Sequence, residues 1–295
     1  MSFIMPPPVV TAASASPRPD AGQAIGIFDS GVGGLTVASA IHWLLPHEDL
    51  IYFGDTGRVP YGNKSPEMII QYSQQISRFL IGQGVKAVVV ACNTATAHAL
   101  SSLQASLPVP VMGVITPGVE AALSATKNGR VGIIGTIGTI QSGAYQKGLL
   151  KRRPDVQLTA IPTPLLVPLI EEDWLNHAAT HLILAEYLSP IQRARCDSLV
   201  LACTHYPLVK GLISTIMGDD VTLVDSAANM ARDLAKRLEA ENLLRSTDVP
   251  HTGRIRIHVS DLPAQFGTMA RRFLGGRIGA IDKVVLDEIK RPDGG

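Results

Sequence analysis

The chain has 295 residues, which is enough for one large or two ordinary domains with a sizeable hydrophobic core. Apolar residues make up 46% and charged residues 17%, so the composition is that of a globular protein. The net charge of +1 gives no basic excess that would favour nucleic acid or an acidic membrane surface as the main partner. No stretch reaches the roughly 18 apolar residues of a membrane span.

The cysteine content and the N-terminal residues lead us to expect a cytoplasmic protein. Three cysteines are too few for a disulfide framework, and their odd number leaves at least one thiol unpaired, as is usual in a reducing compartment. Residues 1–23 are rich in Pro, Ala and Ser, and three consecutive prolines interrupt any apolar core that a signal peptide would need. We therefore expect a flexible N-terminal extension over 1–23 and a C-terminal tail over 287–295.

Nine short apolar runs alternate with longer stretches of helical length. The first eight runs are mostly β-branched, as in parallel strands that are buried on both faces, so the pattern predicts an α/β fold with parallel sheets. The run at 254–260 alternates charged and apolar residues and is expected to be an edge strand with one solvent-exposed face. Arg271 and Arg272 are expected on the solvent face of a helix. The other runs are 24–28, 50–53, 86–91, 109–114, 130–135, 157–162, 198–202 and 221–225, and the clearest helical stretches are 65–83, 173–194 and 227–244.

Two pairs of similar segments within the chain favour two similar sheets over one. The segment GVKAVVVACNT around Cys92 resembles RCDSLVLACTH around Cys203, and IGIFDSG resembles VGIIGTI. Cys203 follows Cys92 by 111 residues and Gly132 follows Gly26 by 106, so the two separations are nearly equal. Two pseudo-equivalent α/β units explain this spacing, although similar strand–loop–helix units can also arise independently.

Polar loops follow the first two strands, at the sheet end where open α/β folds bind ligands. The loop DSGVGG begins at Asp29, and its glycines permit tight turns close to a bound anion, as in a carboxylate-binding or catalytic loop. The alternative for Asp29 is a helix N-cap. The sequence Pro60-Tyr61-Gly62 is a turn that would present a phenol and a bare backbone, or an ordinary connection.

The two cysteines in these similar segments, Cys92 and Cys203, are the strongest indication of chemistry. A helix that starts after Cys92 would place the thiol near its positive end, where thiolate is favoured, and Cys203 has an imidazole two residues away in His205. The alternative for either is a small buried hydrophobe, which is the interpretation we prefer for Cys196. Zinc is a weaker explanation because no further ligand pair follows at the required spacing. A disulfide does not suit a reducing compartment, and a hydrolase that uses Cys203 with His205 would leave Cys92 idle.

A matched pair of thiols suits the inversion of a stereocentre. Inversion needs proton removal on one face of the substrate and delivery on the other, so a thiolate and a thiol can exchange roles. Many racemases rely on pyridoxal phosphate bound to a lysine, but no lysine follows a strand beside a phosphate-type loop here. The sequence therefore predicts a cofactor-independent amino-acid racemase without a metal.

Taken together, the motifs resemble the glutamate racemases of the aspartate/glutamate racemase superfamily. The resemblance covers about residues 24–285, and the combination of motifs is highly specific. The segments that carry it are IGIFDSGVGGLTV, YFGDTGRVPYGNKS, VVVACNTATA, GVITPG, VGIIGTIGTIQSGAY, LACTHYPL, LVDSA and HVSDLPAQFGTMARRFLG.

This resemblance implies a role for each site residue. Cys92 and Cys203 match the two catalytic thiols, Asp29 matches the acid that assists the first thiol, and His205 matches the imidazole that assists the second, with Glu171 as a further acidic helper. Residues that match the positions for the substrate's carboxylates and amine, Asp29 and His205 included, are Ser30, Tyr61, Gly62, Asn93, Thr94, Thr136, Thr139 and Thr204.

The resemblance also implies an architecture and a role in the cell. The fold is two α/β domains with parallel sheets, the first formed by 24–115 with 226–286, the second by 116–225, and the substrate lies in the cleft between them. The expected reaction interconverts L- and D-glutamate for peptidoglycan synthesis. A homodimer, activation by a peptidoglycan precursor and binding to DNA gyrase stay open. Alternatives are an aspartate-type racemase, the hydrolase that uses Cys203 and a non-catalytic binding protein.

Overall fold

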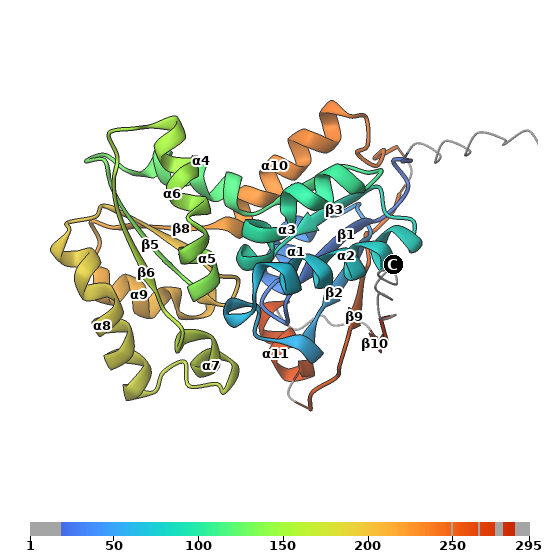
Figure 1. The fold of residues 1–295 in the computed structure, drawn as a ribbon. Helices are drawn as coiled ribbons and strands as arrows, with labels where there is room; N and C mark the ends of the chain where they lie inside the picture. Colours follow the sequence, from blue (N-terminus) through green and yellow to red (C-terminus); the bar gives the residue numbers. More distant parts are fainter. Residues whose placement is uncertain (1–18, 249, 265, 275–279, 287–295) are drawn as a thin grey trace, which may run out of the picture.

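The protein consists of two α/β units that lie side by side (Figure 1). The computed structural model describes residues 19–248, 250–264, 266–274 and 280–286. Most of the predicted N-terminal extension and the predicted C-terminal tail lie outside these residues. Within the described part, no helix has both the length and the apolar character to cross a membrane.

The first unit is built around a six-stranded parallel sheet with the strand order β10-β9-β2-β1-β3-β4. Its strands are β1 (Ile25–Asp29), β2 (Leu50–Gly54), β3 (Ala87–Val90), β4 (Val111–Gly113), β9 (Ile255–Val259) and β10 (Ile281–Lys283). Its helices are α1 (Leu35–Leu44), α2 (Pro66–Gly82), α3 (Asn93–Ser106), α10 (Ser226–Ala240) and α11 (Phe266–Phe273), with short 3-10 turns at Thr56–Arg58 and Tyr61–Asn63.

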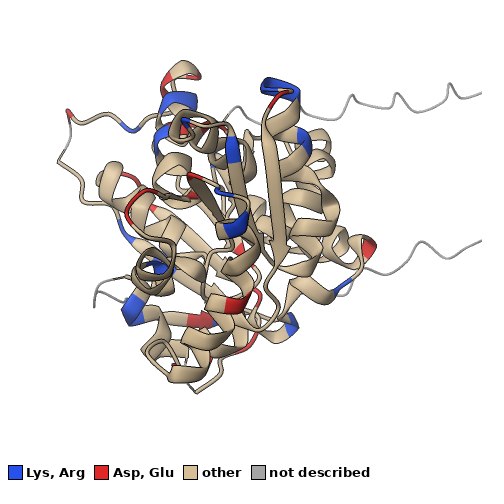
Figure 2. Cartoon of the chain, turned by 90° about the vertical axis from the view of Figure 1, so that its left-hand side faces the viewer, with Lys and Arg blue, Asp and Glu red and all other residues tan. Residues whose placement is uncertain are grey.

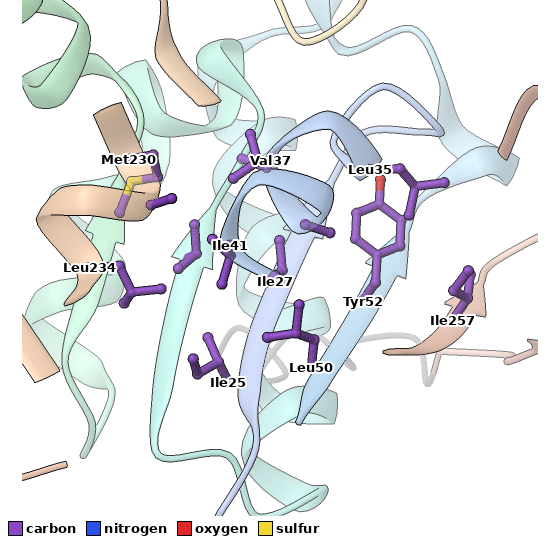
Figure 3. Close-up of a cluster of buried hydrophobic side chains, with 14 of the residues drawn as sticks. Ile25, Ile27, Leu35, Val37, Ile41, Leu50, Tyr52, Met230, Leu234 and Ile257 are labelled. Carbon is purple, nitrogen blue, oxygen red and sulfur yellow. The ribbon is translucent and has the colours of Figure 1, made fainter. Parts of the chain in front are cut away.

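Two layers of apolar side chains cover the two faces of this sheet. Ile25 and Ile27 point to one face, where they pack under α1 together with Met230 and Leu234 of α10 (Figure 3). Phe28, which follows Ile27 and therefore points to the opposite side of the strand, belongs to the cluster on the other face. Both faces of the strand are therefore buried, which explains why the sequence shows a continuous apolar run.

The second unit is built around a four-stranded parallel sheet with the strand order β6-β5-β7-β8. Its strands are β5 (Arg130–Gly135), β6 (Gln157–Pro162), β7 (Ser198–Ala202) and β8 (Thr222–Asp225). Its helices are α4 (Ile115–Ala125), α5 (Ile137–Ser142), α6 (Ala144–Arg152), α7 (Leu166–Glu171), α8 (Ala178–Arg193) and α9 (Lys210–Met217), with a 3-10 turn at Tyr206–Val209.

The similar segments in the sequence correspond to a repeat in topology. The order β2-β1-β3-β4 in the first sheet matches β6-β5-β7-β8 in the second. The register agrees as well: Gly26 lies opposite Val88 in the pair β1–β3, and Gly132 lies opposite Leu199 in the pair β5–β7. The prediction of two similar parallel-sheet units is confirmed.

Two sequence-based expectations about single elements are wrong. The strand at 254–260 is not an edge strand, because β9 pairs with β2 on one side and with the short β10 on the other. The helix expected from residue 173 starts only at Ala178. Asp173 has a φ of 64°, which is incompatible with a right-handed helix, and His177 has an extended backbone and caps the helix that follows. Arg271 and Arg272 are exposed on α11, as expected. Basic and acidic segments are interspersed over the face shown in Figure 2, in keeping with the small net charge.

Candidate active site

The carboxyl ends of strands from both sheets surround one cavity, as expected for parallel α/β units. All predicted site residues line it except Asp29 and Thr139, which lie fully buried behind its wall. The cavity is lined by Ser30, Val59, Pro60, Tyr61, Gly62, Cys92, Asn93, Thr94, Thr136, Val167, Glu171, Ala202, Cys203, Thr204 and His205. Residues from the loops after β1 and β3 therefore meet residues from the loops after β5 and β7.

Cys92 caps the N-terminus of α3 from within the first unit. Its Sγ accepts a hydrogen bond from the backbone N–H of Ala95 at 3.4 Å and lies 3.7 Å from Ser30 Oγ. Burial and the nearby Asp29 carboxylate raise the pKa of the Cys92 thiol to about 12, although both hydrogen bonds act in the opposite direction. The expectation that the helix end would favour thiolate is therefore wrong for Cys92, because burial and a like charge outweigh the helix end.

Asp29 connects the first unit to the second. Its Oδ2 accepts hydrogen bonds from the backbone N–H groups of Gly31 at 3.2 Å and Gly34 at 3.0 Å, and its Oδ1 accepts one from the Thr204 hydroxyl at 3.4 Å. The N-cap residue of α1 is Gly34, so the carboxylate binds the N–H groups of the preceding loop rather than acting as the helix cap itself. Complete burial raises the pKa of Asp29, and His205 and the hydrogen bonds offset part of that increase.

Cys203 lies at the matching position of the second unit but has different neighbours. Its Sγ lies 3.8 Å from Nδ1 of His205, whose Nε2 lies 3.0 Å from Oε1 of Glu171 on α7. Burial alone would lower the pKa of His205, but the contacts with Cys203 and Glu171 prevail and raise it to about 10. The imidazole is therefore protonated at neutral pH and places a positive charge beside the sulfur.

Three threonines join the two units at one wall of the cavity. Thr94 Oγ1, on α3, lies 2.9 Å from Thr136 Oγ1 and 3.1 Å from Thr139 Oγ1, both of which belong to the second unit. Gly62 allows a close approach here, because a Cβ atom at that position would lie 2.8 Å from the Cβ of Thr136. The turn that carries Tyr61 is thus part of the contact between the units.

The partners that hold the cavity wall in place were not identified from the sequence. Tyr61 does not present a free phenol, because its hydroxyl donates to Asp55 Oδ2 at 2.5 Å. Tyr52, fully buried on β2, donates to the carbonyl of Gly31 at 2.6 Å and supports the loop that holds Asp29. Asp55 and Tyr52 both belong to the quoted segment YFGDTGRVPYGNKS, so the resemblance contained this signal, but their partners depend on the folded arrangement.

The structure also addresses the alternatives for the cysteines. All three are free, and Cys196 is buried in the core of the second unit, as expected of a small apolar residue. Among the residues that the structure describes, no three His, Cys, Asp or Glu side chains are grouped in a way that could hold a metal ion.

Comparisons with known proteins agree with this geometry. Residues 36–234 match the model of the Asp/Glu/Hydantoin racemase family. The chain is 50% identical to the glutamate racemase of Geobacter metallireducens over 268 residues, which are 91% of this chain and 98% of that protein.

Two solved structures have the same fold. The Francisella tularensis glutamate racemase in complex with D-glutamate has a TM-score of 0.84 at 38% identity, over 90% of this chain and 99% of that one. The Escherichia coli glutamate racemase in complex with L-glutamate and the activator UDP-MurNAc-Ala has a TM-score of 0.75 at 28% identity, over 92% and 100%. The fold, the paired cysteines at equivalent strand ends and these matches together show that the chain belongs to the Asp/Glu/Hydantoin racemase family.

Proposed function

We propose that the protein is a glutamate racemase that uses two thiols and no cofactor. The observation that carries the proposal is the pair Cys92 and Cys203. Both sulfurs face one cavity from topologically equivalent strand ends of two sheets. Each thiol has its own helpers, Asp29 and Ser30 for the first, His205 with Glu171 for the second.

The arrangement fits transfer of a proton on each face of a substrate α-carbon. In one direction the sulfur of Cys203 removes the α-proton, and the charged His205 imidazole beside it balances the negative charge on this side. Cys92, whose raised pKa keeps it a thiol at neutral pH, donates its proton to the opposite face. The reverse reaction starts from the state that this step leaves: the Cys92 thiolate removes the α-proton and the Cys203 thiol donates one to the opposite face. Each step moves one proton, and the product leaves with the opposite configuration.

The remaining polar residues of the cavity suit a substrate with two carboxylates and an amine. Ser30, Asn93, Thr94, Thr136 and Thr204 offer hydroxyl or amide donors around the thiols. The relatives that match most of this chain are glutamate racemases, and the Francisella tularensis protein binds D-glutamate in its solved structure. We infer the same substrate here, with Thr139 and Tyr61 supporting the cavity wall through their hydrogen bonds.

Several further properties belong to the same proposal. Supply of D-glutamate for peptidoglycan fits the reaction, and the cytoplasm is where the precursors of that polymer are made. Because the Escherichia coli protein was solved with UDP-MurNAc-Ala as an activator, a peptidoglycan precursor is the activator to test first. Homodimer formation and DNA gyrase binding stay open. We place the domain boundaries after residues 115 and 225, where the chain passes between the two sheets.

The test is isotope exchange without added pyridoxal phosphate. The protein is incubated in D2O with each enantiomer of glutamate and, in parallel, of aspartate, and optical rotation and α-hydrogen exchange are followed. We expect both signals with glutamate and neither with aspartate. Faster reaction with aspartate would indicate the sibling activity. Absence of rotation change and exchange with glutamate would contradict the proposal, and a trapped acyl adduct on Cys203 would indicate a hydrolase.

A further inference from the structure

Tyr145 links the two units beside the cavity. It lies on α6 of the second unit, is fully buried, and its hydroxyl donates a hydrogen bond of 2.7 Å to Oδ1 of Asn93. Asn93 is the first residue of α3 in the first unit, directly follows Cys92 and lines the cavity. One buried hydrogen bond therefore joins the second unit to a polar side chain of the cavity wall in the first.

The hydroxyl lies where the chain passes between the units. Gly118 lies on α4, where the chain first passes from the first unit to the second. It leaves room for the hydroxyl, because a Cβ atom there would lie 2.9 Å from the Tyr145 oxygen. Ser226, at the start of α10 on the second crossing, has its Oγ 3.5 Å from the same oxygen. Burial raises the pKa of Tyr145 above its usual value, so the phenol keeps its proton and acts as a donor to Asn93.

This bond has a consequence for the amide of Asn93. A side-chain amide has one carbonyl oxygen, which accepts, and one NH2 group, which only donates. Because Tyr145 donates to the oxygen, the NH2 group is the part that stays available to a ligand in the cavity. An NH2 group is a good partner for a carboxylate. With the amide turned over, an oxygen would face that carboxylate and repel it.

We propose that Tyr145 is a positioning residue that fixes the Asn93 amide so that its NH2 group binds a carboxylate of the substrate. The inference rests on the proposed racemase function. Because the bond crosses from one unit to the other, the amide is held in this orientation only when the two units adopt the arrangement described here. Tyr145 thus couples the relative position of the units to recognition of the substrate.

The test removes the hydroxyl and keeps the ring. We expect Tyr145→Phe to raise KM for glutamate roughly tenfold, the effect of losing one well-placed hydrogen bond to a charged group, with a smaller change in kcat. Asn93→Ala should raise KM at least as much. If Tyr145 acts through Asn93, the double variant should be no worse than Asn93→Ala alone. If the KM increases of the two single variants multiply in the double variant, the proposal is overturned.

Two matched variants separate positioning from a general loss of packing. Ser226→Ala removes the longer contact of the same hydroxyl and keeps the bond to Asn93, so KM should stay within about twofold of the unmodified protein. Gly118→Ala keeps the hydroxyl but displaces it, and should reproduce the KM increase of Tyr145→Phe. An equal KM increase in Ser226→Ala, or an unchanged KM in a folded Gly118→Ala, would contradict the proposal.

The outcomes also distinguish this inference from the proposed function. If the unmodified protein does not racemise glutamate, the function fails and the role of Tyr145 in substrate binding fails with it. If the unmodified protein is active and a folded Tyr145→Phe has an unchanged KM, only the positioning role fails. Urea unfolding of the single and double variants shows which of them are folded and whether the two side chains are coupled in the native state.

Discussion

The hydroxyl of Thr204, on the loop after β7, lies 3.4 Å from Oδ1 of Asp29, the last residue of β1. This contact joins the neighbour of one thiol to the helper of the other, across 175 residues of sequence. The charge of His205 also lowers the pKa of Asp29, against the effect of burial. The surroundings of the two thiols are therefore one connected set of groups, and a change on one side is expected to affect the other.

The glycine at position 33 allows this contact between the units. A Cβ atom there would lie 2.5 Å from both His205 Nδ1 and Thr204 Oγ1. We expect Gly33→Ala to displace the loop after β7 and to lower kcat/KM by about a hundredfold, because shifts near 1 Å are enough to misalign reacting groups. Gly211→Ala is the control, since its added methyl group meets no atom within 4 Å. Equal activity of the two variants would show that the contact is unimportant.

Each of the two thiols should be needed for racemisation. We expect Cys92→Ser and Cys203→Ser each to lower the rate by about 10²- to 10⁴-fold, the usual contribution of a positioned acid or base. Each variant should still exchange the α-hydrogen of one enantiomer slowly in D2O, because one sulfur remains. Cys196→Ala, which changes a thiol buried in the core of the second unit, should keep its activity. Full activity of either serine variant would rule out the two-thiol mechanism.

The ion pair between His205 and Glu171 predicts a pH-dependent stability. The folded-state pKa of His205 is about 10, above the ordinary value of 6.5. A raised pKa stabilises the folded protein fully below pH 6.5, and this contribution is lost as the pH rises through 10. Glu171→Gln removes one cause of the increase, so it should be less stable than the unmodified protein at pH 6 to 8.

Urea unfolding at pH 6, 8 and 10.5 measures this difference. The destabilisation by Glu171→Gln should shrink towards pH 10.5, where most of His205 is neutral in both proteins. Glu172→Gln, at the neighbouring exposed position, is the control and should show no such trend. A destabilisation that is constant over this pH range would mean that the charge on His205 does not contribute.

A second ion pair lies inside the first unit, away from the cavity. Lys86 Nζ lies 2.6 Å from Glu48 Oε2, and both side chains are almost completely buried. Replacing one partner leaves the other charge buried, so Lys86→Met should lower the free energy of unfolding by about 3–5 kcal/mol. Lys210→Met, which breaks the more exposed pair with Asp225, should cost about 0–1 kcal/mol. Similar losses in guanidinium denaturation of the two variants would contradict this assignment.

Hydrophobic patterning was sufficient to predict most of the fold. The strand cores, the parallel class and the repeat follow from apolar runs and their spacing, and the matching registers of Gly26 and Gly132 confirm the repeat. The strand β10 could not be predicted, because Ile281–Lys283 contains one apolar residue among three. Since β10 covers β9, the prediction of an edge strand at 254–260 was also wrong.

The residue types of the site could be predicted, but not their electrostatics. The strand ends and the family motifs identified Cys92, Cys203 and their helpers. The pKa of Cys92 could not be predicted, because it depends on burial and on a carboxylate from another strand. The contact between Asp29 and Thr204 and the bond between Tyr145 and Asn93 likewise exist only because two units meet. Neither leaves a signal in the spacing of residues along one chain.

The unequal helpers of the two thiols are subject to a thermodynamic constraint. Mirror-image amino acids have equal free energies in water, so the equilibrium constant of racemisation is one, and kcat/KM must be the same in both directions. A carboxylate near one sulfur and an imidazolium near the other can therefore never make the enzyme favour one enantiomer at equilibrium. The asymmetry can only change kcat and KM by the same factor. One enantiomer is then bound more tightly and converted more slowly, and the other is bound more weakly and converted faster.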